Sequence, residues 1–168
     1  MKRIKNLYLV YLGFIFVNIS NAAVPGAKII GPITADPIGD PSRNFIYSAS
    51  AIDLASQGYI EEEYFIEGMA NQYTTPDLET GEVIDSDHRY LSRLVVRRPQ
   101  KQDFNGIVIV EWINVTGGPD KDIDWWYAGS HFVRNGYAYI AVSAQQLGIE
   151  TMKEWSPQRY GKLDTTHN

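Results

Sequence analysis

The pattern of hydrophobic and polar residues changes at Gly106. Before this point, apolar and polar residues alternate in two segments, one around Tyr64–Ile66 and one in "RYLSRLVVRRP", which ends at Pro99. Alternation with a period of two is typical of strands. The polar connection between the segments predicts an antiparallel pair, whose first strand lies near the sheet edge. Glu61 and Glu63 fall on one side of that strand, which we interpret as a solvated face.

After Gly106 the pattern predicts a strand, a helix and a second strand. "GIVIVEWI" is almost continuously apolar and predicts a strand covered on both faces over 106–113. A helix is expected from about Ile123 to Asn135, because apolar residues recur there with helical spacing and Gly136 can end it. "YAYIAVSA" at 137–144 predicts the second buried strand.

A strand, a helix and a strand at this spacing form a βαβ unit with parallel strands. The residues from Gly148 onward are predicted to be loop with at most one helical turn. The fold class is therefore α/β, with antiparallel strands that lead into a parallel βαβ unit.

The first 22 residues have the layout of a secretory signal peptide. A basic start, "MKRIKN", precedes the apolar run Leu7–Val17 and the small-residue segment "NISNAA". The run is shorter than the roughly 20 residues that span a bilayer, so cleavage after Ala22 is favoured over a membrane anchor. We expect a secreted or periplasmic protein with a Pro- and Gly-rich lead-in over 23–45 and a partial domain over 46–168.

Charge and composition exclude several classes of function. The chain carries 15 basic and 20 acidic residues, and removal of Lys2, Arg3 and Lys5 with the signal peptide leaves 12 minus 20, or −8. An acidic protein is a poor candidate for binding nucleic acid or an anionic membrane. With no cysteine, disulfides and Cys-based zinc sites are excluded. We predict no cofactor and no metal, and the sequence carries no signal for the oligomeric state.

Three aspartates, Asp120, Asp122 and Asp124, alternate just before the predicted helix. Their spacing resembles that of a calcium loop, but the glycine and the glutamate that an EF-hand needs at its sixth and twelfth positions are missing. Capping of the helix N-terminus explains the aspartates more simply. A looser calcium site, as part of an extracellular binding module, remains an alternative.

The segment Asn114–Gly118 follows the first buried strand directly and contains two adjacent glycines. Glycines permit positive φ and leave backbone N–H groups unobstructed, as an oxyanion hole or anion nest requires. A plain turn is the other interpretation.

Several strings together resemble the opening part of a secreted α/β-hydrolase-domain family of esterase-like proteins. They are "GYIEEEYFIEGMANQY", "YLSRLVVRRP", "FNGIVIVEWINVTGG", "DWWYAGSHFVRNGYAYIAVSAQQLGI" and "WSPQRYG", and they cover about residues 45–161. The resemblance implies the N-terminal part of an α/β-hydrolase-type sheet and a small-molecule ester substrate for a full-length form. It also makes Val115, Thr116, Gly117 and Gly118 the oxyanion-loop candidates.

The nucleophile elbow of that family is missing. None of the 14 glycines is followed two residues later by serine, so the chain has no G-x-S-x-G. We therefore expect no catalytic residue here and no activity from the chain alone. The histidines His88, His131 and His167 are interpreted as bystanders, and Ser143 is interpreted as a structural residue. The alternative is a non-catalytic binding module or a truncated-gene remnant, in which the strand 137–144 would expose an apolar edge.

Overall fold

The computed structural model describes residues 26–166, so the predicted signal peptide lies outside the described residues. The elements follow in the order β1 (Lys28–Ile30), η1 (Ala55–Gln57), β2 (Tyr59–Tyr73), β3 (Val83–Pro99), η2 (Lys101–Asp103), β4 (Val108–Trp112), α1 (Ile123–Arg134), β5 (Ala138–Ser143), α2 (Gln146–Trp155) and α3 (Pro157–Tyr160).

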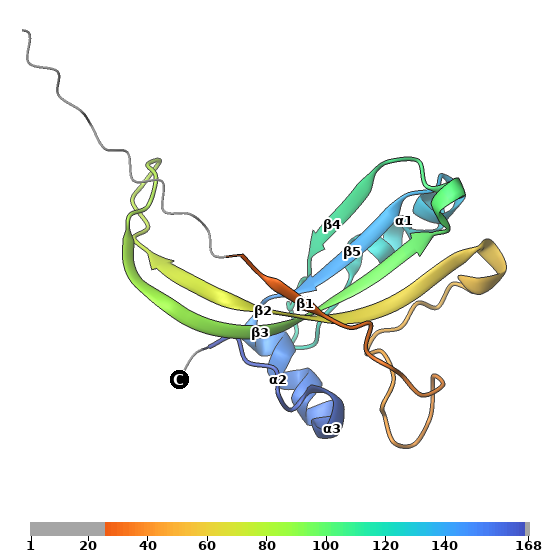
Figure 1. Ribbon diagram of the computed structural model, residues 1–168, viewed down its shortest axis with the longest axis horizontal. Helices are drawn as coiled ribbons and strands as arrows, with labels where there is room; N and C mark the ends of the chain where they lie inside the picture. The colour runs from red at the N-terminus through yellow and green to blue at the C-terminus, as the bar shows by residue number, and fades with distance from the viewer. Residues whose placement is uncertain (1–25, 167–168) are drawn as a thin grey trace, which may run out of the picture.

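The strands form one sheet in the order β1-β2-β3-β5-β4 (Figure 1). The β1–β2, β2–β3 and β3–β5 pairs are antiparallel, and β4 and β5 are parallel. The prediction of antiparallel strands leading into a βαβ unit is confirmed. The lead-in segment contains β1, which pairs with residues 65–67 of β2 and places β2 second from the edge.

The edge strand of the parallel pair is β4. Val108, Val110 and Trp112 are 46%, 62% and 67% exposed, so the prediction that this strand is covered on both faces was wrong. The strand expected to expose an edge, β5, instead has β3 on one side and β4 on the other. Both strands are apolar, and apolar composition cannot reveal which of them the crossover places inside the sheet.

Helix α1 packs against β5 with the side predicted from its apolar residues. The Trp125 ring lies 5.0 Å from that of Tyr139, and Phe132 stacks on the same tyrosine at 6.1 Å. Both Trp125 and Val133 are buried. Gly136, with φ of 72°, ends the helix segment as expected and lets the chain turn into β5.

The segment after β5 is helical, which corrects the prediction of a loop. In α2, Ile149 and Met152 lie three residues apart and are both fully covered. They pack with Tyr160 and Leu163 into a second apolar cluster, separate from the one beneath α1. Gly148 conceals the helical periodicity in the sequence, because glycine is typical of loops and here lies inside the helix.

Glu61 and Glu63 of β2 face the protein interior, so the interpretation of their side of the strand as a solvated face was wrong. Glu63 has no exposed surface. Its carboxylate accepts hydrogen bonds from Arg93 Nε at 2.5 Å, Arg159 Nε at 2.7 Å and the Tyr160 hydroxyl at 2.8 Å. Alternation shows which residues share a face, but it does not show whether that face meets water or protein.

Arg97 lies further along β3, on the same face as Arg93. Its Nε donates to Glu61 at 2.7 Å and its Nη2 donates to the Ser48 carbonyl at 2.9 Å, while Nη1 donates to Asp122. The guanidinium also lies 4.5 Å from the Trp125 ring. We call this network of paired charged side chains the ionic core; its members are Glu61, Glu63, Arg93, Arg97, Asp120, Asp122 and Arg159.

Neighbouring glutamates of β2 provide a test of the ionic core. Glu63→Gln removes the charge that two buried guanidiniums share, and leaving buried charges uncompensated costs about 3–5 kcal/mol. We expect a loss of this size in the free energy of unfolding, measured by urea denaturation.

The matched control is Glu62→Gln. Glu62 accepts from Arg98 at 2.9 Å, but the Arg98 side chain is 42% exposed. Solvent-exposed pairs contribute at most about 1 kcal/mol. Equal losses for the two variants would contradict a stabilising role for the buried charges.

Candidate functional site

The segment Asn114–Lys121, here called the β4–α1 loop, lies beyond the carboxyl end of β4. Ligands of α/β sheets bind beyond this end of the strands. The loop is closed at its base, where Lys121 N–H donates to the Asn114 carbonyl at 2.9 Å. Gln145 Nε2, just beyond β5, donates to the Ile113 carbonyl at 2.8 Å and connects the ends of the two parallel strands.

Hydrogen bonds inside the loop use some of its N–H groups and leave others available. Thr116 N–H donates to Asn114 Oδ1 at 2.7 Å, and Gly118 N–H donates to the Val115 carbonyl at 2.9 Å. Within the described chain, the N–H groups of Val115 and Gly117 have no hydrogen-bond acceptor. Of the four candidate positions, two therefore retain a backbone donor for a ligand.

The conformation of the loop depends on its glycines. Gly117 and Gly118 have φ of 92° and 103°, a region that side chains disfavour. The carbonyl of Thr116 accepts a hydrogen bond from Lys121 Nζ at 3.0 Å. The arrangement has the type of exposed backbone donors that an anionic oxygen requires.

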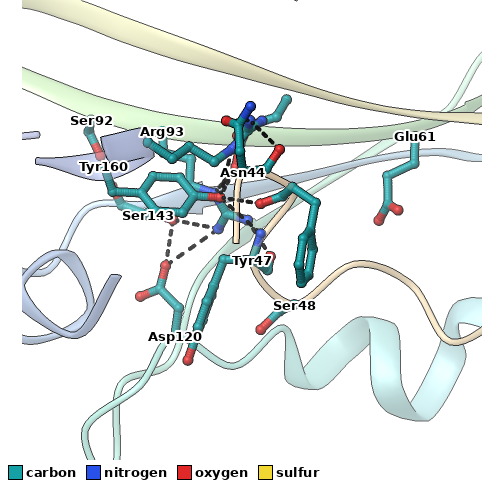
Figure 2. A network of polar contacts seen from close by, with 12 residues as sticks. Asn44, Tyr47, Ser48, Glu61, Ser92, Arg93, Asp120, Ser143 and Tyr160 are labelled. Carbon is teal, nitrogen blue, oxygen red and sulfur yellow. Dashed lines mark hydrogen bonds and ion pairs between the residues drawn. The ribbon is translucent and has the colours of Figure 1, made fainter. Parts of the chain in front are cut away.

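The aspartates after the glycines join the loop to the sheet. Figure 2 shows Asp120 directed at Ser143, whose hydroxyl donates to Oδ2 at 2.5 Å, with Arg93 Nη1 3.8 Å from the same oxygen. Asp122 pairs with Arg97. Because Asp120 contacts Ser143 of β5 and Asp122 pairs with Arg97 of β3, contacts with both strands hold the loop in position.

The expectation that an aspartate side chain caps α1 was wrong, although Asp124 does lie in the first turn of the helix. Asp122 occupies the N-cap position of α1 but makes no capping hydrogen bond with its side chain. The carboxylate of Glu111, from β4, instead accepts from the Asp124 N–H at 3.2 Å. A cap from a neighbouring strand leaves no signal in the sequence around the helix.

Glu111 is also bound from β5. The Tyr139 hydroxyl donates to its carboxylate, and both residues are buried. Burial and the neighbouring carboxylate raise the pKa of Tyr139 far above its usual value. The tyrosine therefore stays neutral and acts as a hydrogen-bond donor that orients Glu111.

Ser143, His131 and His88, the residues that a catalytic triad could have used, each lie against a structural partner. Ser143 donates to Asp120, and its oxygen lies 3.3 Å from Arg93 Nη1. His131 Nδ1 lies 3.4 Å from the Asn135 side chain, and His88 Nε2 lies 3.2 Å from Asp85 Oδ2. Among the described residues, no group of three or more His, Cys, Asp or Glu side chains is arranged to hold a metal.

Gly148 is the close-packing point between α2 and the loop. A Cβ atom at this position would collide with Asp120 Oδ1, and it would lie 3.0 Å from Val115 Cγ1. Alanine normally stabilises a helix interior by about 1 kcal/mol relative to glycine. Here we expect Gly148→Ala to destabilise the fold by about 1–3 kcal/mol, because overpacking outweighs propensity.

A thermal or urea unfolding series measures this effect, and a double variant identifies its cause. Asp120→Ala removes the carboxylate that the new methyl group would meet. Asp120→Ala combined with Gly148→Ala should therefore lose less stability than the sum of the single losses. Strict additivity would show that the collision with Asp120 is not the cause.

The pH dependence of stability should carry a contribution from Asp120. Burial raises the pKa of its carboxyl above 3.8, although the Ser143 hydrogen bond and Arg93 oppose the shift. The folded state therefore holds this proton to a higher pH than the unfolded chain does. The stability from this group is full below the unfolded pKa and is lost as pH rises through the folded pKa.

Asp120→Asn removes this titration. In urea unfolding from about pH 3.5 to about pH 7, the stability of the variant relative to the unaltered chain should increase with pH. Asp40→Asn is the opposite control, because hydrogen bonds from Ser42 lower the pKa of Asp40. For that variant the relative stability should fall as pH rises, and slopes of the same sign would contradict the assignment.

Comparison with known proteins provides one match. A family model described as "Alpha/beta hydrolase domain" matches residues 31–168. Searches of curated proteins and of solved structures return no match. In the described part of the chain, no helix has the length and apolarity needed to cross a membrane. The matched region includes β2, β3, β4 and β5 together with the β4–α1 loop, and of the described strands only β1 lies outside it. The chain therefore belongs to the α/β-hydrolase domain family.

Proposed function

We propose that this chain supplies the oxyanion-binding loop of a carboxylic ester hydrolase. The observation that carries the proposal is the pair of unused N–H groups, from Val115 and Gly117, at the carboxyl end of β4. In α/β-hydrolases, one donor to the oxyanion comes from a loop in this position, and another comes from the residue after the nucleophile.

The chemistry of ester hydrolysis fits such donors. When a nucleophile attacks the ester carbonyl, negative charge develops on the carbonyl oxygen, and preorganised donors stabilise that charge without reorganising. Glycine at 117 places no side chain of its own beside the amide. The ionic core contributes by holding the loop, through Asp120 and Asp122, in one position before the substrate arrives.

The nucleophile, its base and the acid are not assigned to residues of this chain. Ser143 is fully buried and its hydroxyl donates a hydrogen bond to Asp120, which makes it a structural serine. We infer that turnover requires a serine, an acid and a histidine from outside residues 1–168. These residues alone should therefore hydrolyse small p-nitrophenyl esters no faster than buffer does.

Export is part of the same proposal. The basic start and the apolar run Leu7–Val17 support a cleaved signal peptide and a secreted or periplasmic location. The substrate would then be a small ester encountered outside the cytoplasm.

The decisive experiment expresses the whole open reading frame that contains these residues and assays its product on p-nitrophenyl acetate. Gly117→Val should lower kcat about 10²–10³-fold, the usual cost of losing one oxyanion donor, with a much smaller change in KM. Residues 1–168 expressed alone are assayed in parallel and should show no turnover.

Gly106→Val is the matched control. Gly106 also has a positive φ, 89°, and has open space around it, but it precedes β4 at the opposite end of the strand. The backbone strain of the two substitutions is comparable, so only Gly117→Val should lose activity out of proportion to stability. Equal losses would contradict the proposal, as would clear turnover by the chain alone that survives Gly117→Val.

A further inference from the structure

A cavity lies between the segment 48–52 and the first turns of α1. Its volume is about 470 Å³, and it is lined by that segment together with Asp122, Trp125, Trp126 and Ser130. This volume is within the range of small-molecule sites. The β4–α1 loop does not contribute Val115 or Gly117 to the cavity, so the proposed hydrolase function does not account for it.

The wall formed by 48–52 is held rigidly by polar contacts. The Ser48 carbonyl accepts from Arg97 Nη2 at 2.9 Å, and the Ser50 N–H donates to Glu61 at 2.9 Å. The Ser50 hydroxyl accepts from Trp125 Nε1 at 3.2 Å. A wall fixed before binding avoids the entropic cost of ordering it around a ligand.

The backbone at Ser48 supports a functional interpretation of this wall. Ser48 has φ of 55°, in the left-handed region that residues other than glycine rarely adopt. Such conformations persist only where surrounding contacts impose them, and they cluster at binding sites. In this conformation the Ser48 carbonyl accepts a hydrogen bond from Arg97, and Ser48 itself is exposed and lines the cavity.

The charge around the cavity is negative. Asp122 lines it, and Glu61 lies behind the wall, whereas the single guanidinium between them, Arg97, has its donors on Glu61, Asp122 and Ser48. None of the described residues that line the cavity is a lysine or an arginine. An anionic ligand would therefore be repelled, and a cation would be attracted.

The remaining lining is aromatic and small. The Trp126 indole is 60% exposed at the cavity, beside the buried Trp125. An indole face is the best aromatic partner for a cation, and it also packs against an apolar body. The hydroxyls of Ser48 and Ser130 can accept hydrogen bonds from an ammonium group.

We propose that this cavity binds a small organic cation, namely an ammonium group carried on an aromatic or alkyl body. Asp122 and the serine hydroxyls select the ammonium end, and Trp126 packs against the body. The site requires no step of the hydrolase chemistry, so it is tested independently.

The test is calorimetric titration of the purified full chain with three probes that share a phenethyl body. Phenethylammonium should bind about tenfold or more tightly than neutral 2-phenylethanol. The anionic 3-phenylpropanoate should bind more weakly than the alcohol. Equal affinities for the three probes, or no binding of phenethylammonium, would overturn the proposal.

Surface variants of α1 locate the binding without disturbing the ionic core. Trp126→Ala should weaken phenethylammonium binding about tenfold, and Ser130→Trp should abolish it by filling the cavity. Tyr127→Ala is the matched control, because Tyr127 is 87% exposed on the same helix and does not line the cavity. Unchanged affinity in Trp126→Ala and Ser130→Trp chains that melt like the parent would place any binding elsewhere and refute the site.

Discussion

The rest of the structure depends on two buried arginines on one face of β3, because each must be paired with carboxylates from other segments. Arg93 and Arg97 are each 1% exposed, and placing a guanidinium in the interior costs several kcal/mol unless every charge is paired. Their partners come from separate segments: Glu61 and Glu63 from β2, and Asp120 and Asp122 from the β4–α1 loop and the residue that follows it. The pairing therefore restricts both the register of β2 on β3 and the position of the β4–α1 loop relative to the sheet.

This restriction connects stability with the candidate function. A loop of eight residues with two glycines has little intrinsic preference for one conformation. Its free amides at Val115 and Gly117 can act on a developing oxyanion only if they are held in place beforehand. The contacts of Asp120 with Ser143 and of Asp122 with Arg97 supply that support from two strands. The ionic core is thus best understood as the support of the loop, which is a positioning role.

The balance of charge in the ionic core also explains why the pKa of Asp120 is raised. Three guanidiniums, of Arg93, Arg97 and Arg159, face four carboxylates, of Glu61, Glu63, Asp120 and Asp122. Asp120 has the weakest pairing with an arginine, at 3.8 Å, and relies on a neutral hydroxyl for its close contact. Burial consequently raises the pKa of its carboxyl, and the excess of negative charge extends toward the cavity beside Asp122.

Sequence patterns predicted the elements that depend on local spacing. The alternation of β2 and β3, the apolar stripe of α1 and the glycine at 136 all report interactions within a few residues, and each was confirmed. The Gly-Gly pair also pointed to a loop that keeps free backbone donors. The same patterns misassigned Glu63, Asp122 and the edge strand, because these depend on partners from other parts of the chain.

By itself, the sequence determined the α/β class, the family resemblance, the missing nucleophile elbow and the four positions 115–118 as candidates. Only the tertiary structure decided that β5 lies inside the sheet, that the carboxylates meet arginines rather than water, and that two of the four amides remain free. The physical reason is distance along the chain. Glu63 and Arg159 are separated by 96 residues, and no local periodicity records which charge will neutralise another after folding.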